Sequence, residues 1–167
     1  MLARQLIDSV FKPKTRRWKG FDVDVELKDQ WLVDLNAIRG AHVVSVCSGH
    51  SNLGPDGITI AGGSQYPSVN FDVSGLEFAK AMTKAARDAQ TKADMVSWGG
   101  PYENWVLYSN GKPRDDPHIF DADAFKKYPL ESCRHSVLID SKVPRRDGDD
   151  VQVAAWWEGL IQRLQRA

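Results

Sequence analysis

The sequence predicts a single-domain α+β protein, a two-layer sandwich in which helices cover a mainly antiparallel sheet. Three observations lead to this class. The chain of 167 residues is long enough to bury one core. Most of its strand-like segments follow one another through short links, which favours antiparallel pairing. Its helical segments are too few to separate nearly every pair of strands, as a doubly wound parallel fold requires.

The composition is that of an ordinary globular protein, with 42% apolar and 26% charged residues. The 22 Lys and Arg residues balance 22 Asp and Glu residues, so net charge favours neither nucleic acid nor membrane as a partner. No apolar run reaches the length of a membrane span. Arg4 and Asp8 interrupt the apolar core that a secretory signal needs. Two cysteines do not make a disulfide scaffold. We therefore expect a cytoplasmic protein with reduced thiols and no membrane contact.

The first part of the chain is expected to be helical. Residues 1–20 are assigned to a short amphipathic helix and a basic linker, at the periphery of one domain that spans 1–167. A second helix is expected to begin at Asp24, its N-cap, and to end near Arg39, before Gly40. One face of that helix carries its predicted buried residues, which are Leu27, Trp31, Leu35 and Ile38.

The central part alternates strands with one strongly predicted helix. The β-branched run 42–47 and the alternating run 66–73 are expected to be strands. The glycine-rich segment between them is expected to fold over the site as a mobile cover. Ser74 and Glu77 form a capping box that predicts a helix running to about Lys92.

The last part is predicted from turn signals and helical periodicity. Strands are expected at 94–98 and 104–109, before an Asn110-Gly111 tight turn. A short helix near 121–127 and a strand at 136–139 follow. A final helix runs from Asp149 or Asp150 to Leu164, with its apolar stripe at Val153, Trp157, Leu160, Ile161 and Leu164.

The candidate site is the turn that ends the strand 42–47, where an apolar run meets Cys47, Ser48, Gly49, His50 and Ser51. A thiol and an imidazole suit nucleophilic, acid–base or metal chemistry near neutral pH. In one interpretation Cys47 is a nucleophile and His50 is its base. In another, backbone N–H groups of Ser48, Gly49 and Ser51 hold an anionic ligand that His50 also binds. A third interpretation is a buried cysteine followed by a polar turn.

A metal site is a further interpretation of the same turn. Both cysteines lie within three residues of a histidine, which gives four candidate ligands: Cys47, His50, Cys133 and His135. These are ligand types that Zn²⁺ prefers, although the spacing is not that of a common zinc module. The alternative is that Cys133 and His135 begin a strand without approaching Cys47.

The basic segment at 12–19 interleaves cations with Trp18, which is typical of surfaces that contact phosphate and stack on a base. The nucleic-acid candidates are Lys12, Lys14, Arg16, Arg17 and Lys19. The alternative is a solvated linker.

Residues 27–73 also resemble a known family. The motifs are Ile38-Arg39-Gly40 at a helix end, Cys47-Ser48-Gly49-His50 at a strand end, and an aromatic in the next strand, Pro67 to Phe71. They resemble the methyltransferase family of wybutosine synthesis, which acts on a tricyclic guanine derivative in phenylalanine tRNA and carries a Ser-Cys-Ser-Gly-Arg signature. They are also similar to uncharacterised bacterial and phage proteins with a Ser-Cys-Glu-Gly-His pattern.

The resemblance implies an α+β scaffold with a site at residues 47–50, and S-adenosylmethionine and tRNA as ligands. Val46 and His50 replace the first Ser and the Arg of that signature. The missing Arg removes a bidentate cation that would hold a phosphate or carboxylate.

Three functions stay open at this point. The first is an enzyme that binds a nucleotide-type small molecule at residues 47–51, of the kind found in RNA modification. The second is a non-catalytic binding or interaction domain of phage or mobile-element type. The third is a zinc-stabilised domain.

Overall fold

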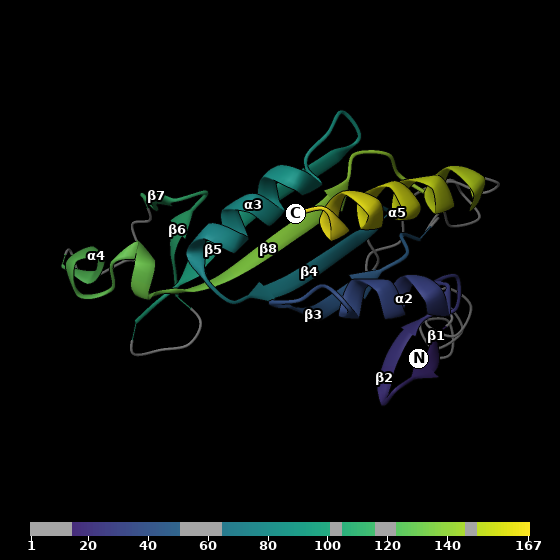
Figure 1. Ribbon diagram of the computed structural model, residues 1–167, viewed down its shortest axis with the longest axis horizontal. Coiled ribbons are helices and arrows are strands. Elements are labelled where there is room, and N and C mark those ends of the chain that lie inside the picture. Colours follow the sequence, from purple (N-terminus) through teal and green to yellow (C-terminus); the bar gives the residue numbers. More distant parts are fainter. Residues whose placement is uncertain (1–14, 51–64, 101–104, 116–122, 146–149) are drawn as a thin grey trace, which may run out of the picture.

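The computed structural model describes residues 15–50, 65–100, 105–115, 123–145 and 150–167, and six of their strands form one antiparallel sheet (Figure 1). In spatial order the strands are β3 (Ala41–Cys47), β4 (Ser68–Val73), β8 (Arg134–Ser141), β5 (Thr91–Trp98), β6 (Val106–Ser109) and β7 (Lys112–Pro113). A separate hairpin of β1 (Thr15–Trp18) and β2 (Phe21–Asp24) lies beside β3.

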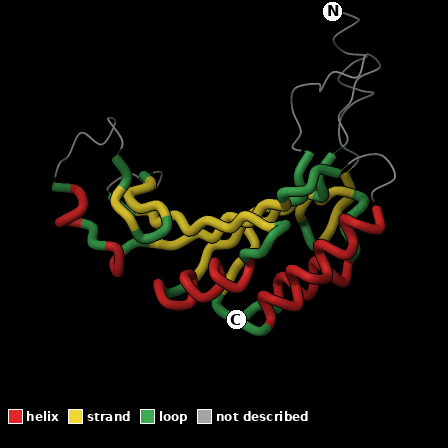
Figure 2. Tube along the Cα trace, turned by 90° about the horizontal axis from the view of Figure 1, so that it is seen from above, coloured by secondary structure: helices red, strands yellow, loops and turns green. Residues whose placement is uncertain are grey.

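Three helices cover one side of the curved sheet, as Figure 2 shows. They are α2 (Asp29–Asn36), α3 (Leu76–Ala86) and α5 (Asp150–Gln165). A short helix α4 (Ala124–Lys127) and a 3₁₀ turn η1 (Leu130–Ser132) precede β8. The predicted α+β class with a mainly antiparallel sheet is therefore confirmed.

The core lies between the sheet and these helices. Alternate residues of the central strands point into it, among them Val69, Phe71, Val137 and Ile139, which are all fully buried. The helix α5 adds its own apolar stripe, and its Trp157 is fully buried. The predicted stripe of the final helix, Val153, Trp157, Leu160, Ile161 and Leu164, is buried throughout.

The two outer strands of the sheet differ. One edge is β7, which has two residues and includes Pro113. The other edge is β3, which has seven residues and an irregularity between Val43 and Ser45. Val44 is the extra residue there, and its exposed fraction is 59%.

Several predicted elements are confirmed. The expected strands at 42–47, 66–73, 94–98 and 104–109 correspond to β3, β4, β5 and β6. The Asn110-Gly111 turn has both φ angles positive, +50° and +78°, as a two-residue hairpin turn requires.

The expected helix from Asp24 is wrong at its start. Phe21–Asp24 is a strand, paired with Thr15–Trp18, and the helix begins only at Asp29. The reason is the Lys19-Gly20 turn, where both residues have positive φ and reverse the chain. Part of the basic linker is therefore a strand, and Asp24 is not a helix cap.

The capping box is also wrong. Gly75 is the N-cap of α3, and the Ser74 hydroxyl donates instead to the Gly40 carbonyl oxygen at 3.0 Å. The helix stops at Ala86, since Arg87 is extended and Asp88 pairs with Thr91 at the start of β5.

The predicted helix before residue 12 lies outside the described residues, and so does the predicted cover at 52–65 apart from Gln65. Within the part of the chain that the structure describes, no helix is long and apolar enough to cross a membrane.

Candidate metal centre

Three side chains converge where β2 and β3 end. Asp24 is the last residue of β2, Cys47 is the last residue of β3, and His50 follows in the turn. Asp24 is buried, whereas Cys47 and His50 are partly buried. The β1–β2 hairpin brings the carboxylate to the end of β3, so the group depends on contacts between distant parts of the sequence.

The donor atoms of this group face one another. The His50 Nε2 atom lies 3.4 Å from the Cys47 Sγ atom and 3.5 Å from Asp24 Oδ2. The three donor atoms all lie within 4.8 Å of one another. Ligand atoms of a tetrahedral Zn²⁺ site are about 3.3–3.6 Å apart, given metal–ligand distances of about 2.0–2.3 Å. The two distances from His50 therefore suit a shared metal ion.

A nucleophilic triad fits this geometry less well. In a triad the base contacts the nucleophile through one ring nitrogen and the carboxylate through the other. Here Cys47 and Asp24 both lie against the same nitrogen, His50 Nε2. The three side chains therefore converge on one point instead of forming a relay.

The thiol is not activated by its protein surroundings. Burial raises the pKa of Cys47, and the nearby carboxylates of Asp24 and Glu26 raise it further, against a hydrogen bond from the Gly49 backbone that lowers it. A raised pKa keeps the thiol protonated at neutral pH, which disfavours a free nucleophile. A bound cation reverses this balance, because it stabilises the thiolate.

A backbone hydrogen bond orients the carboxylate. The Ser48 N–H donates to Asp24 Oδ2 at 2.7 Å, and both residues are buried. This N–H is consequently not free for an anionic ligand, as one sequence-based interpretation required. A buried carboxylate needs compensation beyond one donor, and a cation at His50 and Cys47 would supply it.

Contacts of Arg145 and Gly49 hold the turn at residues 48–50 in place. The Arg145 Nε donates to the Ser48 carbonyl oxygen at 3.2 Å, and its Nη1 donates to Asp150 at 2.8 Å. Gly49 has φ +77°, and a Cβ there would lie 2.8 Å from the Gln65 carbonyl oxygen. The turn is thus packed against the chain just before β4, where only glycine fits.

The structure does not assemble the four predicted zinc ligands. Cys47 pairs with Ser68, which pairs with Asp140 near the end of β8, whereas His135 lies near its start. Five residues of strand separate these positions by roughly 17 Å. Cys133 and His135 therefore belong to another region, and Asp24 is the third member of the group at Cys47 and His50.

Each of the two distant residues has its own contacts. The Cys133 Sγ donates to the Pro129 carbonyl oxygen at 3.5 Å. The His135 Nδ1 is hydrogen-bonded to the Ser97 hydroxyl at 2.9 Å inside the protein.

Sequence analysis missed Asp24 because an Asp before an apolar helical pattern resembles an N-cap. The useful signal was Trp18-Lys19-Gly20-Phe21, two aromatics around a turn dipeptide, which is typical of a hairpin. Ser51, the remaining predicted ligand-binding residue, lies outside the described residues.

That residues 47–51 line a ligand pocket stays a prediction, because Ser51 and the segment after it lie outside the described residues. Three cavities of about 200, 560 and 240 Å³ are lined by other residues.

The described cations of the basic segment have partners. Arg16 contacts Asp29 and the Leu27 carbonyl oxygen, and Arg17 contacts Asp22 at 3.0 Å. Lys19 lies over the Trp18 ring. Lys12 and Lys14 lie outside the described residues. Local pairing reduces the charge that Arg16 and Arg17 offer to a phosphate.

Comparison with known proteins gives no relative, because no protein-family model, curated protein or solved structure matches this chain.

Proposed function

We propose that the protein binds one Zn²⁺ ion through Asp24, Cys47 and His50 and uses it in hydrolysis. The observation that carries the proposal is the contact of both Cys47 Sγ and Asp24 Oδ2 with the same atom, His50 Nε2. Nitrogen, sulfur and oxygen donors in one group are the set that Zn²⁺ prefers.

The number of ligands supports a catalytic role over a purely structural one. Structural zinc sites use four protein ligands, whereas catalytic sites use three and leave the fourth position to water. The described residues supply three. Zinc lowers the pKa of such a water to about 7, which makes hydroxide available at neutral pH.

Glu26 is the candidate proton acceptor. Its exposed carboxylate accepts a hydrogen bond from the Ser48 hydroxyl at 3.4 Å, and its charge acts on Cys47. It is therefore close to the group and accessible to solvent, as a general base for a bound water must be.

Metal binding is tested by cobalt substitution, because a thiolate bound to Co²⁺ gives a charge-transfer absorption band. We expect one Co²⁺ per chain and a band that Cys47→Ser abolishes. Cys133→Ser is the matched control and should keep the band. Asp24→Asn should weaken Co²⁺ binding about 10- to 100-fold, while Asp22→Asn should not. A band that survives Cys47→Ser would contradict the site.

Hydrolysis is tested separately, with zinc-loaded protein and a panel of ester, amide and phosphodiester substrates. Glu26→Gln should lower the rate by about 10²–10⁴-fold while leaving the cobalt band unchanged. Stoichiometric metal without activity on any substrate class would instead support the zinc-stabilised domain.

The enzyme of nucleotide type predicted from the sequence needs free backbone donors at residues 48–51. The Ser48 N–H is already bonded to Asp24. This contact favours the metal over an anionic ligand at the same turn.

A further inference from the structure

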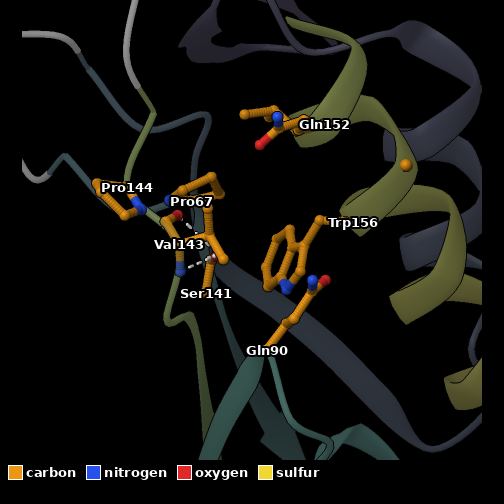
Figure 3. A pocket seen from close by; sticks show the side chains of 9 residues that line it. Pro67, Gln90, Ser141, Val143, Pro144, Gln152 and Trp156 are labelled. Atoms are coloured by element: carbon orange, nitrogen blue, oxygen red, sulfur yellow. Dashed lines mark hydrogen bonds between the residues drawn. The ribbon is translucent and has the colours of Figure 1, made fainter. Parts of the chain in front are cut away.

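A small pocket lies between the start of α5 and the ends of β4, β5 and β8. Figure 3 shows the Trp156 indole on one side and Pro67, Val143 and Pro144 on the other. Gln152 and Gln90 lie at the two ends of the gap. The volume is about 200 Å³. This is below the range of drug-sized ligand sites, about 300–1,000 Å³, and therefore suits a single or fused ring.

The residues that line the pocket determine which charge a bound ligand can carry. Among the described residues, no side chain that lines this pocket is charged: they are Pro67, Gln90, Ser141, Val143, Pro144, Gln152, Val153, Ala155 and Trp156. An ionised group there would lose water without gaining a partner of opposite charge. The pocket accordingly selects a neutral ring.

The polar groups of the pocket are two primary amides. Neither side-chain amide, of Gln90 or of Gln152, has a hydrogen-bond partner in the described part of the chain. A glutamine amide offers a donor and an acceptor side by side, which matches the edge of a nucleobase. The face of an indole supplies stacking that any flat heteroaromatic ring accepts.

Both walls are held in place before a ligand arrives. The Trp156 Nε1 donates to the Thr91 hydroxyl at 3.0 Å, and the ring packs edge-on against Trp157 at 4.8 Å. Opposite, the Ser141 N–H donates to the Pro67 carbonyl oxygen at 2.8 Å. The Ser141 hydroxyl also bonds both backbone groups of Val143, at 2.9 and 3.0 Å. Preformed walls reduce the ordering cost of binding.

From these observations we propose that the pocket between Trp156 and Pro67 binds a neutral nucleobase-type ring, stacked on the indole and hydrogen-bonded at its edge by Gln90 and Gln152. The proposal does not depend on the metal site. The two sites are neighbours, however, because Pro67 lines the pocket and also packs against Gly49.

The test measures binding of four small probes to the full chain by ligand-observed NMR. Adenine and cytosine present a polar edge. Indole has a similar flat shape without that edge, and benzoate is flat but charged. We expect saturable binding of at least one base, weaker binding of indole, and none of benzoate.

Variants assign the binding to this pocket. Gln152→Leu and Gln90→Leu keep the size of each side chain and remove its amide, so each should weaken base binding about tenfold and leave indole unchanged. Gln30→Leu, on the exposed face of α2, is the matched control and should change nothing. Trp156→Phe should weaken both bases and indole, with folding checked by circular dichroism.

Two results would overturn the proposal. One is the absence of saturable binding by either base. The other is base binding that the Gln90 and Gln152 substitutions leave unchanged or that indole equals, which would make the pocket a general apolar crevice.

Discussion

Gly49→Ala is the substitution whose cost the structure defines most directly. The backbone at Gly49 has φ +77°, where an L-residue costs about 1–2 kcal/mol. The new Cβ would lie 2.8 Å from both the Gln65 carbonyl oxygen and Pro67 Cδ, well inside the usual contact of about 3.5–4.0 Å. Overpacking of this kind adds about 1–3 kcal/mol. We expect Gly49→Ala to lower the free energy of unfolding by about 2–5 kcal/mol in total.

Gly20→Ala separates the two contributions. Gly20 has φ +91°, but a Cβ there would meet no atom within 4 Å. This variant should lose only the conformational cost, about 1–2 kcal/mol. Urea unfolding of metal-free protein measures both losses and their difference, which should be about 1–3 kcal/mol. Equal losses at Gly49 and Gly20 would show that the turn does not pack against the chain before β4.

Substitutions at Asn110, His135 and Ser74 give three independent tests. Asn110→Ala should lower the free energy of unfolding by about 2 kcal/mol, because the residue has a left-handed backbone and its side chain accepts a hydrogen bond from the Met95 N–H. Asn110→Gly should lose about 1 kcal/mol, because glycine tolerates that backbone and only the hydrogen bond is lost. Urea unfolding measures both losses, and equal losses would refute the role of the turn. Burial lowers the pKa of His135, and the positive charge of the Lys80 ammonium lowers it further. On acidification this histidine therefore takes up a proton at a higher pH in the unfolded chain than in the folded protein. The free energy of unfolding should then fall as the pH drops below about 6.5, and His135→Gln should flatten this dependence on pH in unfolding curves. Ser74→Ala should cost about 0.5 kcal/mol without shortening α3, and its effect should add to that of Glu77→Ala, since Glu77 bonds Lys80 and not Ser74. Stability losses of the two substitutions that do not add would instead support a capping box between Ser74 and Glu77.

The elements that sequence analysis predicted well are those with strong local signals. The final helix has an apolar stripe over four turns, and Asn110-Gly111 is a turn whose backbone few other residues adopt. Burial of Val69, Phe71 and Val73 in β4 follows from an alternating pattern that any sheet accepts, whereas the β-branched run of β3 forms an edge strand with no buried residue. These features depend on neighbours in the sequence.

The elements that were missed depend on distant contacts. Ser74 and Glu77 have the spacing of a capping box, but Gly40 lies close enough to take the serine hydroxyl. Asp24 has the position of a helix cap, but the hairpin places it against Ser48 and His50. Two of the three candidate ligands, Cys47 and His50, were predictable from one strand end. The third ligand was not, because the distance between Asp24 and Cys47 is decided by how the hairpin packs on β3.

The irregularity at Val44 also bears on how copies of this protein meet one another. Any open sheet presents unpaired backbone groups along its outer strands, where a second chain can add a strand and begin aggregation. On one side β7 offers two residues, and Pro113 lacks an N–H. On the other side β3 is long enough to recruit a strand, but the extra residue breaks the regular spacing of its backbone groups. Val44 thus limits self-association at the longer edge, although its exposed side chain adds nothing to the core.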